Sequence, residues 1–154
     1  MTQVNVRFCM EMAKSYAEKM SGCQKVKVGS AIVKENAIVS LGANRSMPDL
    51  CSSRGCLRVE RYGDDGKAHR NPGDCRAIHS EIDAISHAKT DLCGATIVVT
   101  RYPCESCAKA IISAGIKSVY YGGTTKMSDE TIRMFESYGV DHHFVEGYRD
   151  DSDR

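Results

Sequence analysis

Two short motifs constrain the fold of this chain more than any other feature of its sequence. The first is His79-Ser80-Glu81, and the second is Pro103-Cys104-Glu105-Ser106-Cys107. One imidazole and two thiols form the ligand set of a catalytic zinc site, in which three protein ligands leave the fourth position open. If His79, Cys104 and Cys107 bind one zinc ion, the two segments that carry them must lie side by side in the folded chain.

The second motif is expected at the start of a helix. Pro103 suits the first helical turn, where its missing N–H costs nothing, and residues 108–115 read as a helix ended by Gly115. Cys104 and Cys107 would then share one face of that helix. The partial positive charge at a helix N-terminus lowers the pKa of a thiol and favours the thiolate that zinc needs.

The first motif is expected to open a second helix, over residues 78–88. The predicted buried side of this helix consists of its apolar residues, namely Ile78, Ile82, Ile85 and Ala88. Two helix starts that face each other would complete the metal site. Glu81 follows two residues after His79, so it points in another direction and need not bind the metal.

The ligand set also predicts a chemistry. Two thiolates and a neutral imidazole balance the charge of zinc, and zinc lowers the pKa of a bound water from about 15.7 to roughly 7. Glu81 could accept the proton that this water loses and return it to a substrate. The alternative is a closed structural zinc site, which would have no use for Glu81 and would need a fourth protein ligand.

Composition limits the classes of protein to consider. The 154 residues are 42% hydrophobic and 27% charged, which is typical of a globular protein, and we expect a single domain over residues 1–154. No apolar run has the length of a membrane span, and residues 1–10 lack the layout of a signal peptide. The eight cysteines then indicate thiols and metal binding in the cytoplasm rather than disulfides. A formal net charge of +1 gives no basic footprint for nucleic acid, and together with the lack of a long apolar run we expect neither a nucleic-acid nor a membrane partner.

Hydrophobic periodicity predicts alternating helices and strands. Helices are expected over residues 5–20, 78–88, 104–115 and 129–138, the last capped by Ser128, and strands over residues 28–33, 37–42, 95–100, 117–121 and 143–145. Residues 45–76 read as an irregular insert that contains Cys and His. The first two strands form a hairpin, and the later alternation implies parallel strands with right-handed crossovers. The predicted fold class is α/β, a three-layer α/β/α sandwich with a mixed five-stranded sheet.

The order H-x-E followed by P-C-x-x-C is the signature of the zinc-dependent nucleobase deaminases. Over roughly residues 3–146 the chain resembles the deoxycytidylate (dCMP) deaminases of bacterial and phage type. The stretches that carry the resemblance are Val28–Val33, Gly42–Asn44, Cys75–Glu81 and Thr100–Lys109. The cysteine-bearing insert and the Tyr-Pro-Cys context narrow the resemblance from the deaminase superfamily to the dCMP deaminases. The sequence departs from the family at Ser80, where alanine is usual, and at Asp83, where asparagine is common.

The resemblance implies a cytidine deaminase-like fold and the hydrolysis of dCMP to dUMP and ammonia, which supplies dUMP for thymidylate synthesis. Glu81 would be the catalytic proton shuttle. Asn44 would hold the sugar, unless it is only a turn residue that ends the hairpin, and Ser80 and Tyr102 are further candidate substrate contacts. Many members are homohexamers that dCTP activates and dTTP inhibits, with Mg²⁺ accompanying the triphosphate. Arg45 is then a candidate allosteric contact, or otherwise a solvated side chain.

The insert also suggests a second, structural zinc. A polar segment buries little surface, so a metal ion would offset its ordering entropy, and some relatives have a zinc ion here. The preferred ligands are Cys23, Cys51, His69 and Cys75, with Cys56 in reserve. The alternative is a set of free cysteines.

Other functions stay open at this point. The substrate could be another cytosine nucleotide or nucleoside, such as dCTP or cytidine. A deaminase acting on tRNA should show clustered basic and aromatic residues, whereas this chain is nearly neutral and has no tryptophan. The chain could also be a catalytically inert, zinc-stabilised nucleotide-binding module, although such a module would not need Glu81.

Overall fold

The computed structural model describes residues 3–23, 26–47, 51, 56–62, 75–124 and 126–148. Five strands form a mixed sheet in the order β2-β1-β3-β4-β5. The strands are β1 (Gly29–Lys34), β2 (Ala37–Ala43), β3 (Thr96–Val99), β4 (Ser118–Tyr121) and β5 (Asp141–Phe144). The helices are α1 (Gln3–Met20), α2 (Leu57–Tyr62), α3 (Ser80–His87), α4 (Glu105–Ser113) and α5 (Asp129–Ser137).

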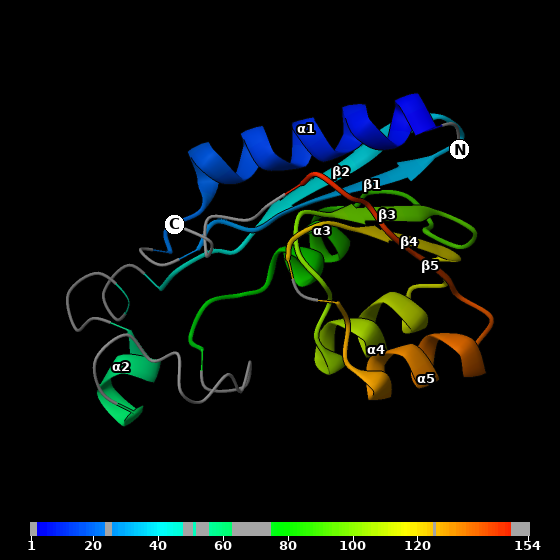
Figure 1. Ribbon diagram of the computed structural model, residues 1–154. Helices are drawn as coiled ribbons and strands as arrows, with labels where there is room; N and C mark the ends of the chain where they lie inside the picture. Colours follow the sequence, from blue (N-terminus) through cyan, green and yellow to red (C-terminus); the bar gives the residue numbers. More distant parts are fainter. Residues whose placement is uncertain are drawn as a thin grey trace.

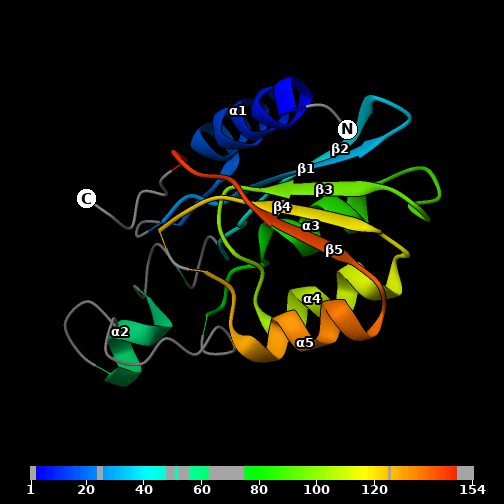
Figure 2. The ribbon, with the colours of Figure 1, turned by 45° about the vertical axis from the view of Figure 1, so that its right-hand side comes forward.

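Helices cover both faces of this sheet (Figure 1). Helix α1 lies along one face, where Met10 and Ala13 join a buried cluster with Val98 of β3. Helices α3, α4 and α5 cover the opposite face, and the larger core cluster there includes Ile111 of α4 and Phe135 of α5. The turned view in Figure 2 shows the same three layers. The predicted α/β/α sandwich is therefore confirmed.

The strand directions also follow the prediction. Strands β1 and β2 pair as an antiparallel hairpin, whose turn residues Glu35 and Asn36 have φ angles of 53° and 64°. Two central residues with positive φ are typical of the type I′ turn, whose twist matches that of the flanking strands. Strand β1 is antiparallel to β3, whereas β3, β4 and β5 are mutually parallel. The last three strands alternate with α4 and α5, as the sequence indicated.

Helix α3 differs from its prediction at its start and in the side that it buries. It begins at Ser80, because Ile78 is extended and exchanges two backbone hydrogen bonds of 2.9 Å with Arg45. Ile78 is consequently 41% exposed, and Ile82, Ile85 and Ala88 are only partly buried. The buried residues of α3 are Ser80, Glu81, Asp83 and Ala84. The prediction was wrong for Ile78, whereas Ile85 and Ala88 do pack against the main core cluster. The fully buried side of α3 is nevertheless largely polar and lies against the end of β2.

Strand β2 and helix α3 are in direct backbone contact at Gly42. A Cβ atom at this position would overlap the carbonyl oxygen of Ser80 and the backbone nitrogen of Ala84. Ser40 adds a side-chain hydrogen bond of 2.6 Å from its Oγ to the carbonyl oxygen of Ala84. The start of α3 is therefore held against the sheet at a backbone separation that only glycine allows.

The described part of the insert is not wholly irregular, because it contains the six-residue helix α2. A helix this short gives little periodic signal, which explains why the sequence did not predict it. The cap of α5 is confirmed, since Ser128 Oγ accepts a hydrogen bond of 3.2 Å from the backbone N–H of Thr131.

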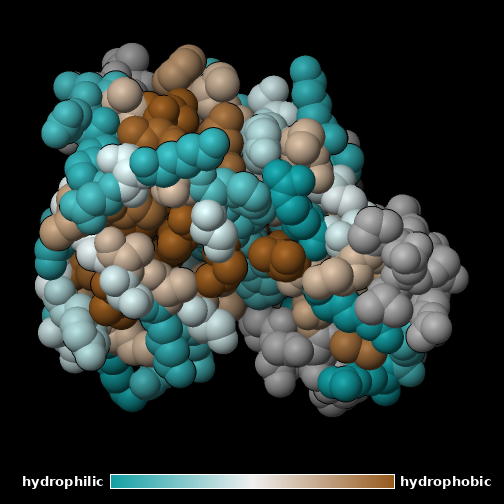
Figure 3. Space-filling model, turned by 180° about the vertical axis from the view of Figure 1, so that it is seen from behind, coloured by the Kyte–Doolittle hydropathy of each residue, from teal (hydrophilic) through white to brown (hydrophobic). Residues whose placement is uncertain are grey.

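The surface seen from behind Figure 1 carries separate apolar patches among hydrophilic side chains (Figure 3). None of the helices in the described ranges combines the length and the apolar character that crossing a bilayer requires.

Candidate metal centre and active site

Three of the predicted ligands meet in space. His79 Nδ1 lies 3.5 Å from Cys104 Sγ and 3.3 Å from Cys107 Sγ. The potential ligand atoms of these three residues all lie within 4.8 Å of one another. No other group of His, Cys, Asp and Glu side chains within the described residues meets this criterion.

The backbone explains how these side chains come together. His79 is the N-cap of α3 and Cys104 is the N-cap of α4, and neither side chain caps its own helix. Both imidazole and thiol thus remain available to face each other, with Cys107 one turn into α4. The predicted pair of facing helix starts is confirmed. Pro103 precedes the N-cap, however, and so lies outside the helix rather than in its first turn.

The protonation of these groups fits a metal site. The pKa of the Cys104 thiol falls to about 4, chiefly because Cys107 donates a hydrogen bond to it, and His79 contributes in the same direction. The hydrogen bond with Cys104 raises the pKa of His79 to about 10. The same Cys104 contact and burial raise the pKa of Cys107. One thiolate is thus stabilised by two neighbouring protons, both of which a cation could replace.

The donor set suits zinc in particular. Two sulfur atoms and one imidazole nitrogen are the borderline-soft ligands that zinc prefers over magnesium or calcium. Three protein ligands form an open set, whereas a closed structural site needs four. Within the described residues, His79, Cys104 and Cys107 are therefore suited to a catalytic rather than a structural zinc.

Glu81 lies beside this cluster without belonging to it. Its side chain is buried, being 4% exposed, and Cys107 is hydrogen-bonded to its carboxyl group. Burial raises the pKa of Glu81, since desolvation disfavours its charged form. A buried carboxyl group next to a metal site is available to exchange protons, as a general base must.

The hydroxyl group of Ser80 contacts both strand β1 and Glu81. Ser80 is fully buried, its Oγ lies 2.7 Å from Ser30 Oγ, and it donates a hydrogen bond of 3.2 Å to Glu81 Oε2. Ser30 was not predicted as a site residue, because nothing in its strand pattern marks it as part of a site. A direct contact between Ser80 and a substrate stays a prediction.

Asn44 follows the end of β2, and its side chain is held by the segment before β1. Its Oδ1 accepts hydrogen bonds from Ser21 Oγ at 2.5 Å and from the N–H of Val28 at 2.9 Å. Its Nδ2 donates to the carbonyl oxygen of Val26 at 2.8 Å, which leaves one amide hydrogen for another partner. The predicted contact with a sugar therefore has one donor available and stays a prediction.

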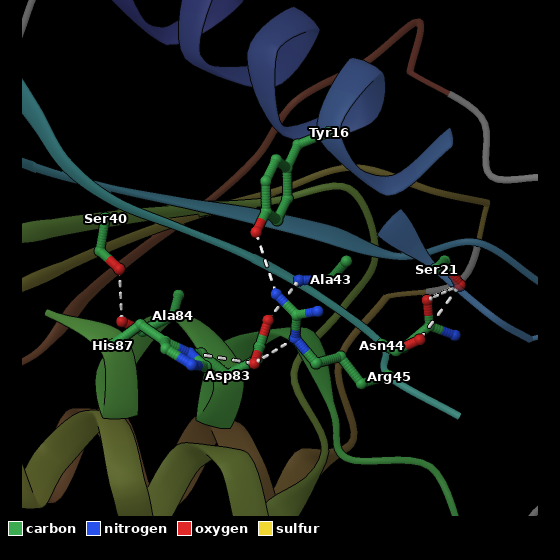
Figure 4. A network of polar contacts seen from close by, with 9 residues as sticks. All are labelled: Tyr16, Ser21, Ser40, Ala43, Asn44, Arg45, Asp83, Ala84 and His87. Atoms are coloured by element: carbon green, nitrogen blue, oxygen red, sulfur yellow. Dashed lines mark hydrogen bonds and ion pairs between the residues drawn. The ribbon is translucent and has the colours of Figure 1, made fainter. Parts of the chain in front are cut away.

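Arg45 takes part in a polar network that joins α1, β2 and α3 (Figure 4). Its Nε donates to Asp83 Oδ1 at 2.8 Å, and its Nη2 donates to Tyr16 Oη at 3.0 Å. Asp83 is 2% exposed, and its Oδ2 accepts a hydrogen bond of 3.0 Å from the backbone N–H of Ala43. The hydrogen bond to Asp83 raises the pKa of Arg45 further above its ordinary value. Arg45 thus binds within the protein, and its predicted contact with an effector is untested.

Tyr102 is half-buried against the main core cluster, and the guanidinium carbon of Arg101 lies 5.4 Å from the centre of its ring. Its position next to Pro103 keeps it close in sequence to the metal ligands. Its contact with a substrate stays a prediction.

The structure does not assemble the predicted second zinc site from the residues that it describes. The hydrogen bond with His79 lowers the pKa of Cys75, which places Cys75 beside the cluster of His79, Cys104 and Cys107. Cys51 Sγ accepts a hydrogen bond of 3.4 Å from the N–H of Met47. His69 lies outside the described residues, so a four-ligand site with Cys23 stays a prediction.

Comparison with known proteins finds one matching family and several relatives of similar sequence. The family described as "Cytidine and deoxycytidylate deaminase zinc-binding region" matches residues 4–123. ComE operon protein 2 of Bacillus subtilis is 37% identical over 143 residues, which cover 88% of this chain and 69% of that protein. Deoxycytidylate deaminase of Mycobacterium phage D29 is 32% identical over 108 residues, which cover 68% of this chain and 84% of the phage protein.

The match to the deoxycytidylate deaminase of Saccharomyces cerevisiae is 31% identical and covers 86% of this chain but only 42% of the longer yeast protein. Among solved structures, the apo dCMP deaminase of cyanophage S-TIM5 superposes with a TM-score of 0.67 at 24% identity, covering 94% of this chain and 100% of the phage chain. This likeness supports the assignment of the fold.

Proposed function

Because the chain belongs to the cytidine and deoxycytidylate deaminase family, a family of zinc-dependent hydrolases, we propose that it converts dCMP and water to dUMP and ammonia. The observation that carries the proposal is the open cluster of His79, Cys104 and Cys107 with the buried carboxyl group of Glu81 beside it. Relatives named deoxycytidylate deaminase, and the cyanophage protein crystallised with dCMP and dUMP, support the choice of substrate.

His79, Cys104 and Cys107 would hold the metal ion. When bound there, zinc supplies an open coordination position at which water becomes a good nucleophile near neutral pH. The position of the ligands at the N-termini of α3 and α4 favours the thiolate form that binding requires.

Glu81 performs the proton transfers in this proposal. As the oxygen of water bonds to the ring carbon that carries the amino group, Glu81 accepts a proton and donates it to the adjacent ring nitrogen. A second proton transfer to the amino group allows the carbon–nitrogen bond to break and ammonia to leave. The substrate gains the oxygen of water and loses its amino group, and Glu81 returns to its initial state. Burial of Glu81 keeps bulk water from competing for these protons.

The test is ammonia release from dCMP, dCTP, deoxycytidine and cytidine by the zinc-loaded protein. We expect dCMP to be the preferred substrate. We also expect Glu81→Gln to lower kcat by about 10²- to 10⁴-fold while the zinc content is unchanged. Glu105→Gln is the matched control, because Glu105 is an exposed carboxylate next to Cys104 and should not affect turnover. Equal turnover by Glu81→Gln and the wild type would remove Glu81 from the mechanism, and activity on cytidine alone would contradict the proposed substrate.

We propose that the product enters thymidylate synthesis and that a homohexamer is activated by dCTP with Mg²⁺ and inhibited by dTTP. Since Arg45 already binds Asp83 and Tyr16, an effector there would use the remaining guanidinium nitrogen or displace Tyr16. Saturation curves for dCMP with and without each triphosphate, together with the native mass, test this point. Curves that neither triphosphate shifts would exclude the regulation.

A second zinc held by Cys23, Cys51, His69 and Cys75 is also proposed. Metal analysis of the wild type should then give two zinc ions per chain, and Cys51→Ser should lose one of them. One zinc ion per chain in the wild type would exclude this site.

A further inference from the structure

A chain of buried hydroxyl groups leads from β1, an inner strand of the sheet, to Glu81. Ser30 of β1 and Ser80 of α3 are both completely buried, and their Oγ atoms lie 2.7 Å apart. Ser80 Oγ also lies 3.2 Å from Glu81 Oε2, and Glu81 itself is 4% exposed. Both contacts therefore lie in the interior, where a hydrogen bond is electrostatically stronger than in water.

The number of protons fixes the direction of these hydrogen bonds. An ionised carboxylate only accepts hydrogen bonds, and a serine hydroxyl has a single proton to donate. When Ser80 donates its proton to Glu81, the 2.7 Å contact with Ser30 requires Ser30 to be the donor and Ser80 the acceptor. All three groups are satisfied in this arrangement only if the protons run from Ser30 through Ser80 to Glu81.

The hydroxyl chain begins at a rigid part of the fold. Ser30 lies on β1, and its backbone pairs with Gly42 of β2 on one side and with Val99 of β3 on the other. Ser80 is the first residue of α3, and its carbonyl oxygen packs directly against Gly42. Both serine backbones are thus fixed by the sheet, so their hydroxyl groups can fix the carboxyl group that follows.

We propose that Ser30 and Ser80 are positioning residues that hold one oxygen of the Glu81 carboxyl group and leave the other oxygen for the reacting groups. This inference rests on the proposed role of Glu81 in deamination. A carboxyl group anchored at Oε2 loses its freedom to rotate, so proton transfer begins from one fixed geometry. Loss of the anchor should slow turnover without changing how substrate binds.

The primary variant is Ser80→Ala, which removes the donor to Glu81 and no other side-chain atom. We expect kcat to fall by about 10-fold or more, with KM changed by less than about 2-fold and the zinc content unchanged. Ser30→Ala should cause a smaller loss of about 3-fold, because Ser80 keeps its own proton. Ser40→Ala is the matched control, since Ser40 is a buried serine that donates to α3 at Ala84 but not to Glu81 (Figure 4). It should retain the wild-type kcat.

Two further measurements separate positioning from a general structural role. In the Glu81→Gln background, Ser80→Ala should cause no additional loss, because its effect passes through Glu81. In substrate-free, zinc-loaded protein with ¹³C-labelled glutamate, the side-chain carboxyl resonance of Glu81 is assigned by its absence from Glu81→Gln. Ser80→Ala should shift this resonance, and Ser40→Ala should not.

A wild-type kcat and an unshifted Glu81 resonance in Ser80→Ala would overturn the proposal. So would loss of zinc, or a thermal midpoint well below that of Ser40→Ala, because Ser80 would then be a structural residue. If the wild type releases no ammonia from dCMP, the proposed function fails, and the Glu81 resonance in Ser80→Ala still decides whether the serines position the carboxyl group.

Discussion

Replacement of Asp83 by alanine should destabilise the protein by about 2–4 kcal/mol, although we propose no role for Asp83 in binding metal or substrate. Asp83 is 2% exposed and accepts hydrogen bonds from the backbone N–H of Ala43 and from Nε of Arg45. It therefore ties the end of β2 to α3, the helix that carries Glu81, the proposed proton shuttle.

The magnitude follows from what the substitution leaves unpaired. Ala43 is completely buried, and a buried N–H without a partner costs about 1–3 kcal/mol. Loss of one partner of a fully buried ion pair costs roughly 3–5 kcal/mol. The side chain of Arg45 is 33% exposed and keeps its contact with Tyr16. Solvent therefore reduces the cost of leaving the Arg45 charge without Asp83 to about 1 kcal/mol.

The assay is urea unfolding of the zinc-loaded protein, with ΔG obtained by linear extrapolation. Asp91→Ala is the control, because the Asp91 side chain pairs with Lys34 at 3.5 Å but is 75% exposed. This control should lose no more than about 1 kcal/mol. If Asp83→Ala is as stable as Asp91→Ala, the network in Figure 4 does not hold β2 against α3.

Two further predictions concern the stability of the fold, and a third concerns the metal ion. Gly42→Ala should lower the unfolding free energy by at least about 1–3 kcal/mol, because its methyl group would overlap Ser80 and Ala84; a wild-type urea midpoint would contradict this. Ser128→Ala should cost about 1 kcal/mol in the same assay, since it leaves the N–H of Thr131 without its cap, and an unchanged midpoint would rule out that contribution. Removal of zinc by a chelator should abolish ammonia release, and zinc but not magnesium should restore it; full activity of the metal-free protein would refute a zinc mechanism.

The parts of the fold that the sequence predicted correctly depend on local patterns. The order of strands and helices follows from hydrophobic periodicity, and Ser128 is a local cap signal that the structure confirms. The meeting of His79 with Cys104 and Cys107 was predictable because a metal site requires its ligands to converge, however distant they are in sequence.

The parts that the sequence did not predict depend on contacts between distant segments. Helical spacing favoured an apolar buried face with Ile78, but Ile78 instead pairs with Arg45 and the buried face of α3 carries Glu81 and Asp83. A buried polar side is stable only because partners such as Ser30 lie opposite it, and no pattern along one segment contains those partners. Periodicity therefore predicts the buried face of α3 less well than that of the other helices, because the buried side of α3 is largely polar.

X-ray absorption at the zinc edge, combined with metal analysis, determines whether a zinc ion at His79, Cys104 and Cys107 has an open fourth position. In Cys51→Ser, which leaves His79, Cys104 and Cys107 intact, we expect one zinc ion per chain with two sulfur ligands at ~2.3 Å. One imidazole nitrogen and one light atom that no side chain supplies should lie at ~2.0–2.1 Å. A zinc ion with four protein ligands, or a folded protein that binds no zinc at His79, Cys104 and Cys107, would rule out an open catalytic zinc site.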